Sequence, residues 1–317
     1  MTLTPLRLLC LILIASIPWQ VWLPYLIGAV ILGLGVSMAV KNEASQRRDR
    51  DKITPDKIVL KIVVLGPVFL AVPIAVFGAE HFAFSKSVAQ MVPSFMPGHL
   101  FWVCFVGTCL IGAALSLVIG KHAGLASALF GIMLLMFELL LHIPGIVRAP
   151  GNRIIWAVAL RDLAFSGGAL AFAATQTETW RKQGTHWVLG LVRFFVGIPI
   201  IFFGVENFLH PEFAPGVPLA RLTPLWIPAH LLWGYLTGAV FVAAGISLIF
   251  NKESRLAATW LGLMILLLVL VVYVPIVVAN PSDIGNGLNY LVDTLLLGGS
   301  VLAFAGSQRG SLVTRVA

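Results

Sequence analysis

Two stretches of this chain are nearly the same, and that repeat restricts how the chain can fold. Residues 92–168 align without a gap with residues 223–299 at an offset of 131 residues, and 23 of the 77 pairs are identical. Because 59% of the chain is hydrophobic, many apolar matches would arise by chance. The informative matches are therefore the polar residues, prolines, tryptophans and glycines. They are Pro93, Pro97, His99, Trp102, Lys121, Pro144, Asp162 and Gly167–Gly168, matched by Pro224, Pro228, His230, Trp233, Lys252, Pro275, Asp293 and Gly298–Gly299. A repeat of this length predicts an internal duplication.

A shorter match lies upstream of each copy. The segment Phe77–Phe82 (FGAEHF) recurs as Phe203–Phe208 (FGVENF), so Glu80 corresponds to Glu206. The offset here is 126 residues (206 − 80), which places a five-residue difference in the loop that follows. Each copy is therefore expected to begin with a helix that ends near a glutamate.

The composition indicates an all-α membrane protein. Only 11% of the residues are charged and the mean hydropathy is +0.97, whereas soluble domains carry roughly a quarter charged residues. Apolar runs near 20 residues recur, and each can cross a hydrocarbon core of about 30 Å as a helix. The short alternating segments of a membrane barrel are absent. The three cysteines lie in apolar runs without a CxxC pair, so we expect no disulfide framework and no metal site.

The apolar runs predict about ten transmembrane helices, as two parallel-repeat four-helix bundles preceded by an N-terminal hairpin. Prolines and tryptophans interrupt residues 1–40, which favours a hairpin of helices 3–17 and 23–40, with one long kinked helix as the alternative. A charged linker, 41–57, follows. Repeat one (58–180) is expected to hold helices 58–80, 99–120, 123–144 and 155–176, and repeat two (181–317) helices 187–208, 229–250, 254–279 and 287–306.

The basic residues predict the orientation. With the linker 41–57 inside, the inner loops hold thirteen Lys and Arg and the outer loops four, which is a positive-inside bias. Each repeat has an even number of spans, so both copies should face the same way. We therefore expect a multi-pass protein of the bacterial inner (plasma) membrane with both termini cytoplasmic. Because the net charge of +8 lies in these loops, the lipid bilayer is the expected partner and nucleic acid is not.

Ionisable residues within spans mark the candidate site, because such residues usually face protein or a water-filled cavity. By the predicted topology they gather in the outer third of the membrane. Glu138 and His142 are four residues apart and share a helix face. The catalytic or ligand-binding candidates in repeat one are Glu80, His81, His99, His142, Arg161 and Asp162, and their repeat-two equivalents, together with a buried arginine, are Glu206, His230, Tyr273, Asp293 and Arg193.

Repeat one is the richer copy, because His81, Glu138, His142 and Arg161 are replaced in repeat two by Asn207, Val269, Tyr273 and Val292. A purely structural interpretation stays open for every candidate. The glutamates could bridge helices, the histidines could bond loops, and the aspartates could bond a neighbouring helix. The paired glycines are expected to permit close helix contact.

The segment Arg193–Asn207 (RFFVGIPIIFFGVEN) resembles the first helix of the DoxX-like bacterial membrane proteins, which carries an Arg, then glycines, then a polar residue near an FxxG-type end. Arg193 and Glu206 match the Arg and the terminal polar position, and Glu80 matches the latter in repeat one, where Pro67 replaces the Arg. The family often has Lys where these glutamates stand. The resemblance covers residues 58–306 and implies two four-helix units. It also implies a link to thiosulfate–quinone and other membrane redox systems.

Three functions fit these observations. One is a membrane redox component that binds quinone, with His99 or His142 and Asp162 handling protons; a haem held by His81 and His99 is the less favoured variant. The second is a small-solute transporter, although the sequence indicates no interrupted helix at a central site. The third is a non-catalytic assembly subunit whose linker 41–57 contacts a protein partner or anionic lipid. Whether the protein is an enzyme stays open.

Overall fold

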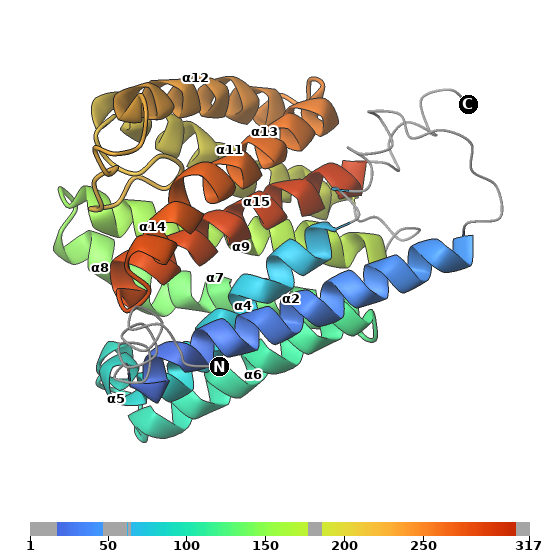
Figure 1. Cartoon of the computed structure of the whole chain (residues 1–317), viewed down its shortest axis with the longest axis vertical. Helices are drawn as coiled ribbons and strands as arrows, with labels where there is room; N and C mark the ends of the chain where they lie inside the picture. The colour runs from blue at the N-terminus through green and yellow to red at the C-terminus, as the bar shows by residue number, and fades with distance from the viewer. Residues whose placement is uncertain (1–17, 47–61, 63–64, 177–185, 309–317) are drawn as a thin grey trace, which may run out of the picture.

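The computed structural model describes residues 18–46, 62, 65–176 and 186–308 (Figure 1). Within these ranges the chain is helical, and its one pairing of extended residues is an isolated bridge between Phe213 and Leu222. Nine of the described helices are long and apolar enough to cross a membrane. The prediction of an all-α, multi-pass membrane protein is confirmed.

The helices of the described ranges follow one another in two similar series. The N-terminal helix and the first series are α2 (Trp19–Gln46), α4 (Gly66–Ala83), α5 (Ser85–Val88), η1 (Ala89–Met91), α6 (His99–Ile119), α7 (Ala123–Phe137), η2 (Glu138–His142), α8 (Ile143–Arg148) and α9 (Arg153–Gln176). The second series is α11 (His186–Leu209), α12 (His230–Ile249), α13 (Ser254–Leu268), η3 (Val269–Tyr273), α14 (Val274–Ala279), η4 (Ile284–Leu288) and α15 (Asn289–Ser307). Three of these elements are π-helical turns: η2 in the first series, and η3 and η4 in the second.

The described helix nearest the N-terminus is longer than the helix predicted there. The helix predicted at 23–40 begins at Trp19 and runs to Gln46, with Pro24 inside it. A proline removes one backbone hydrogen bond, and membrane helices tolerate that loss when neighbouring groups compensate. The first helix of the predicted hairpin, 3–17, lies outside the described residues, as does the linker 41–57 beyond Gln46.

The helix bounds of the two series are separated by the spacing of the sequence repeat. α6 begins at residue 99 and α12 at residue 230, a difference of 131. The same difference separates the starts of α7 and α13, of η2 and η3, and of α8 and α14. Left-handed backbone conformations, which are uncommon for residues other than glycine, also recur at this distance. The pairs are Gly98 and Ala229, Gly120 and Asn251, and His122 and Glu253.

The long helices form two rings that share a pair of helices. The first ring contains α4, α6, α7, α9 and α15, and the second contains α11, α12, α13, α15 and α9, with each helix packed against the next. In Figure 1, α9 and α15 lie between the other helices of the two rings. The first helix of each series thus packs against the last helix of the other series, so the two halves interlock.

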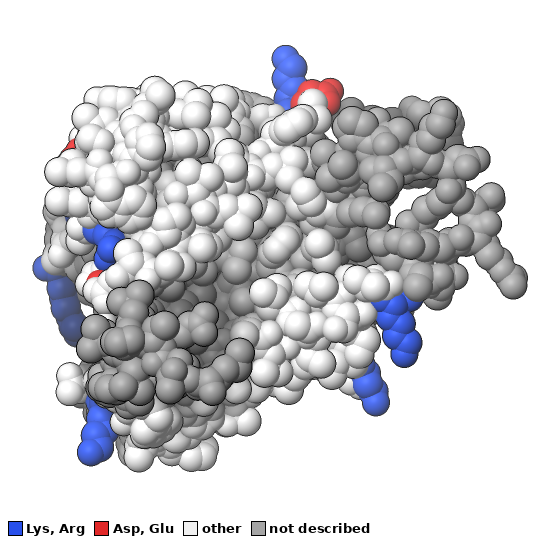
Figure 2. All heavy atoms as spheres, in the orientation of Figure 1, with Lys and Arg blue, Asp and Glu red and all other residues white. Residues whose placement is uncertain are grey.

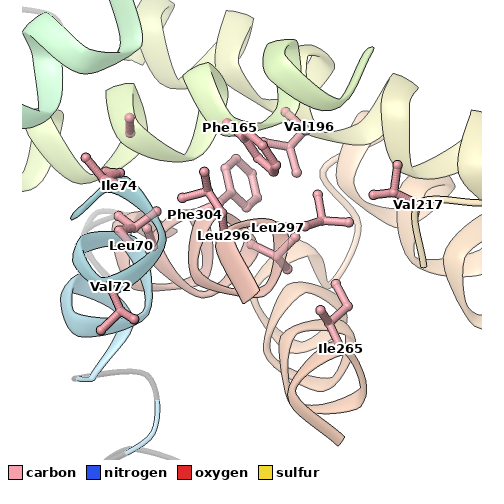
Figure 3. Close-up of a cluster of buried hydrophobic side chains, with 14 of the residues drawn as sticks. Leu70, Val72, Ile74, Phe165, Val196, Val217, Ile265, Leu296, Leu297 and Phe304 are labelled. Atoms are coloured by element: carbon pink, nitrogen blue, oxygen red, sulfur yellow. The ribbon is translucent and has the colours of Figure 1, made fainter. Parts of the chain in front are cut away.

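Paired glycines allow the close approach of the shared helices, as the sequence indicated. A Cβ on Gly167 of α9 would lie 2.9 Å from Val196 of α11, and a Cβ on Gly299 of α15 would lie 2.8 Å from the Phe69 backbone of α4. Around these contacts Leu70, Phe165 and Phe304 fill the core between α4, α9 and α15 (Figure 3).

The outer surface is suited to lipid. Large apolar side chains are exposed along the long helices, and Figure 2 shows an uncharged band on this face, with the Lys and Arg side chains at its two ends. The chain therefore presents its apolar surface where a bilayer would contact it.

Candidate functional site

An arginine joins the two shared helices. Arg161 of α9 donates from Nε to Asp162 Oδ1 at 2.9 Å and from Nη1 to Asp293 Oδ2 of α15 at 2.6 Å. Asp162 and Asp293 are matching positions of the sequence repeat, so one guanidinium bridges an aspartate from each half of the chain. Asp162 is nine residues into α9, which begins at Arg153, or about 14 Å along a helix.

The third helix of the first series adds two more groups from its π-helical turn. His142 Nε2 lies 2.9 Å from Asp162 Oδ2. Glu138 lies close enough to His142, Asp162 and Arg161 to interact electrostatically with them. Its Oε1 is buried and has no hydrogen-bond partner among the described residues.

The predicted helix 123–144 contains a π-helical turn, η2, and continues to Arg148. In η2 the Ile143 N–H bonds to Glu138 O, five residues back, and η3 shows the same bond from Val274 to Val269 O. Pro144 and Pro275 follow these turns and cannot donate a backbone hydrogen bond, which explains why the regular helix is disturbed there. Single π-helical turns occur often at functional sites, and this one presents Glu138 and His142.

Glu80 completes the group at the end of α4. It is buried, and the Asn289 amide, with its nitrogen toward the carboxylate, donates to both Glu80 oxygens at 2.5 and 3.1 Å. Glu80 and Asp293 interact electrostatically. On the other side of Glu80, Tyr25 of α2 donates to Pro281 O at 2.9 Å.

The carboxyl groups outnumber the basic groups in this cluster, which we call the central cluster: Glu80, Glu138, His142, Arg161, Asp162 and Asp293. Asp293 is 5% exposed and its Oδ1 has no partner among the described residues. The four carboxyl groups face one arginine and one histidine. An isolated charge is costly to bury, so this arrangement can take up protons or a cationic group. All of its members come from helices of the first ring.

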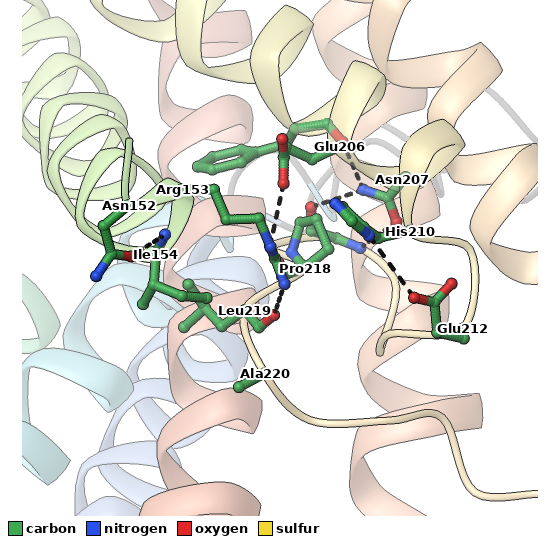
Figure 4. A network of polar contacts seen from close by, with 12 residues as sticks. Asn152, Arg153, Ile154, Glu206, Asn207, His210, Glu212, Pro218, Leu219 and Ala220 are labelled. Atoms are coloured by element: carbon green, nitrogen blue, oxygen red, sulfur yellow. Dashed lines mark hydrogen bonds and ion pairs between the residues drawn. The ribbon is translucent and has the colours of Figure 1, made fainter. Parts of the chain in front are cut away.

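The second ring binds a segment of its own chain instead. Arg153, at the start of α9, donates to Glu206 Oε2 at 3.0 Å and to the carbonyls of Pro218 and Leu219 at 2.7 and 2.5 Å (Figure 4). The Tyr273 hydroxyl donates to Pro215 O at 2.7 Å. These bonds hold the loop between α11 and α12 against the ring.

Several predicted site residues lie apart from the central cluster. His81 Nδ1 bonds Phe77 O, one turn back in the same helix, at 2.8 Å. His99 and His230 are half-buried at helix starts, and neither makes a side-chain hydrogen bond within the described ranges. Arg193 lies at the other end of α11 from Glu206, with its guanidinium 5.1 Å from the Phe194 ring centre and its Nε buried without a described partner.

The sequence interpretation missed Arg153, Asn289 and Tyr25. Arg153 was counted only as an outer-loop charge. It stands at the start of a predicted span on the same side of the membrane as Glu206, and this placement would have been a usable signal. Asn289 and Tyr25 gave no signal, because their contacts join helices far apart in sequence. Among the described residues, no group of three or more His, Cys, Asp or Glu could hold a metal ion.

Comparisons with family models, with curated proteins and with solved structures found no match to this chain.

Proposed function

We propose that this protein is a transporter of a small solute, with its site at the central cluster between two duplicated halves. The observation that carries the proposal is the Arg161 bridge between Asp162 and Asp293, which joins the halves through buried charges. Transporters with internal repeats bind their substrates at the interface between the repeats, often beside interrupted helices. The π-helical turn that presents Glu138 and His142 is an irregular turn within one continuous span, and such turns occur often at functional sites.

Three further features support a duplication. They are the shared helix bounds, the π-helical turns at equivalent positions and the recurring left-handed residues. α11 is the fourth span after α4, with three spans between them, so the copies would run in the same direction, with an axis along the membrane normal. The inner membrane of a bacterium and two cytoplasmic termini remain part of this proposal, as does the resemblance to the DoxX-like proteins.

A membrane redox component is the second candidate. The His142–Asp162 pair, at 2.9 Å, is suited to proton transfer, because a histidine oriented by a carboxylate can accept and release protons near neutral pH. In that function the cluster exchanges protons with a quinone. Purified protein would then contain quinone, and Asp162→Asn would abolish its redox turnover.

The two functions are separated by a flux assay. The full chain is reconstituted in liposomes, and uptake of radiolabelled small solutes and of protons is measured. Transport predicts that flux requires the protein and falls at least tenfold in Asp162→Asn, whereas Glu212→Gln, a change on the exposed outer loop, keeps it. The absence of any solute or proton flux would refute the transporter. Bound quinone together with redox loss in Asp162→Asn would then identify the redox component.

If Asp162→Asn and Glu80→Gln both keep the cell phenotype while changes in the linker 41–57 remove it, the protein is an assembly subunit. That linker lies largely outside the described residues, and its protein partner stays a prediction.

A further inference from the structure

The second ring contains a buried piece of loop. Residues 214–219 lie between α11 and α12, and every one of them is buried. Loops normally run over the surface, because buried backbone groups need partners. Here the partners are side chains: Asn207 exchanges two hydrogen bonds with Gly216, and Tyr273 bonds the Pro215 carbonyl. We call residues 214–219 the inserted segment.

The partners of the inserted segment come from several helices of the second ring. Arg153 of α9 bonds the carbonyls of Pro218 and Leu219. The hydroxyl of Tyr290, in α15, accepts bonds from the backbone N–H groups of Ala220 and Arg221, just beyond the segment. The segment is thus a built-in occupant of the second ring.

The first ring has no such occupant in the described part of the chain. The equivalent loop, residues 84–98, is five residues shorter, folds into the short helices α5 and η1, and contains no buried residue. The first-ring side chains that correspond to Tyr273 and Asn207 are also more exposed than those two residues. Tyr273 is fully buried, but its equivalent His142 keeps 16% of its side chain exposed. Asn207 is buried, but its equivalent His81 is half-buried.

The rings also differ in how they neutralise their equivalent glutamates. Glu206 receives the guanidinium of Arg153. The residue equivalent to Arg153 at the start of the other shared helix is Ile284 (153 + 131), so Glu80 has only the neutral amide of Asn289. The first ring therefore has no counterpart of Arg153 among the described residues, and its own Arg161 is already paired with Asp162 and Asp293.

Two unsatisfied acceptors lie in the central cluster. Glu138 Oε1 and Asp293 Oδ1 are buried and have no hydrogen-bond partner among the described residues. Both are carboxyl oxygens, so a ligand that satisfies them must supply N–H or O–H donors. Charge-assisted bonds from a cationic nitrogen to a carboxylate are among the strongest hydrogen bonds in proteins.

We propose that the first ring binds a small organic cation, a guanidinium or primary ammonium group on a compact apolar body, where the second ring holds Arg153 and the inserted segment. The cationic group pairs with Glu80, Glu138 and Asp293, and the apolar body takes the place of the prolines of the inserted segment. This inference rests on the proposed transport site and names its substrate class.

Binding is tested with two probes of nearly the same shape. Methylguanidinium carries a charge and methylurea does not. Their binding to the purified full chain in nanodiscs is measured by isothermal titration and by the shift in Tm. We expect one methylguanidinium per chain and at least tenfold weaker binding of methylurea. Equal binding of the two probes, or proton uptake by the cluster with no methylguanidinium binding, would overturn the proposal.

Two variants locate the binding. Glu138→Gln removes a carboxylate whose Oε1 has no described partner, so the fold is preserved, and methylguanidinium affinity should fall about tenfold, the equivalent of about 1.4 kcal/mol. Ile284→Arg places an arginine in the first ring at the position that Arg153 has in the second ring. This change should abolish methylguanidinium binding, while size-exclusion chromatography still shows a folded protein. Glu212→Gln on the outer loop should bind as the original chain does. Unchanged affinity in both Glu138→Gln and Ile284→Arg would refute the assignment.

The outcome is separable from that of the flux assay. Methylguanidinium binding without any flux would refute transport and keep the site. Flux of neutral solutes without methylguanidinium binding would keep transport and refute this substrate class.

Discussion

Removing the Arg161 guanidinium should destabilise the protein more than any other single loss of a polar group in the central cluster. In Arg161→Met the side chain keeps most of its length, but Asp162 loses the bond from Nε and Asp293 loses the bond from Nη1. Removing one partner of a buried ion pair costs about 3–5 kcal/mol, because it leaves an uncompensated charge. Part of that cost is relieved here, since 19% of the Arg161 side chain is exposed, so we expect about 3 kcal/mol.

Arg161→Lys gives a graded test of the same interaction. A lysine carries its charge on one nitrogen, so it cannot reproduce the fork that reaches both carboxylates. It should lose one charge-assisted hydrogen bond, about 1.5–3 kcal/mol, and fall between the original chain and Arg161→Met.

Stability is measured by denaturant unfolding of the purified protein in detergent micelles, followed by tryptophan fluorescence. Arg148→Met is the matched control, because Arg148 is exposed at the end of α8, and its loss should cost less than about 1 kcal/mol. If Arg161→Met unfolds at the same denaturant concentration as Arg148→Met, the bridge does not hold the halves together and the reasoning from buried charge is wrong.

Three other predictions test the arrangement of the helices. Arg153→Ala frees two loop carbonyls and a carboxylate, so it should cost roughly 2–4 kcal/mol and speed proteolysis of residues 210–221. Gly299→Val places side-chain atoms against the α4 backbone and should reduce the yield of folded protein, whereas Gly33→Ala, which meets nothing within 4 Å, should not. Cysteines that replace Lys121 and Lys252 should react with an impermeant thiol reagent from the same side of the membrane, and labelling from opposite sides would contradict the parallel arrangement.

The sequence predicted the helices well because each long helix coincides with an apolar run. α6, α7 and α13 begin within one residue of their predicted starts. The membrane solvent explains this agreement, since a span must be apolar and must satisfy its backbone within the helix. Within the described residues, the largest discrepancy in the helix bounds was the extension of α2, which runs over Trp19–Gln46 and not 23–40. The predicted helix start at 58 lies outside the described residues. At the end of α2 an apolar stretch adjoins a charged one, and composition alone sets no boundary there.

The sequence predicted the members of the central cluster but not how they pair. The repeat identified Asp162 and Asp293 as equivalent, and the substitutions at positions 142 and 161 identified the first copy as the richer one. The bridge from Arg161 to Asp293 could not be predicted, because it depends on α9 and α15 lying side by side. His81 and His99 were grouped with the cluster because they are close to it in sequence, yet His81 bonds its own helix.

The sequence by itself determined that this chain crosses a membrane many times, where each span lies, and which positions of the two copies correspond, since these depend on local hydrophobicity and on identity at a fixed spacing. Only the tertiary structure decided that α4 packs on α15 and α11 on α9, so that the halves interlock. It also decided that a loop fills the second ring, and that Glu138 Oε1 and Asp293 Oδ1 in the central cluster have no hydrogen-bond partner among the described residues. The physical reason is that burial and charge pairing depend on contacts between helices more than a hundred residues apart. The apolar pattern along a helix does not show which other helix will pack against it.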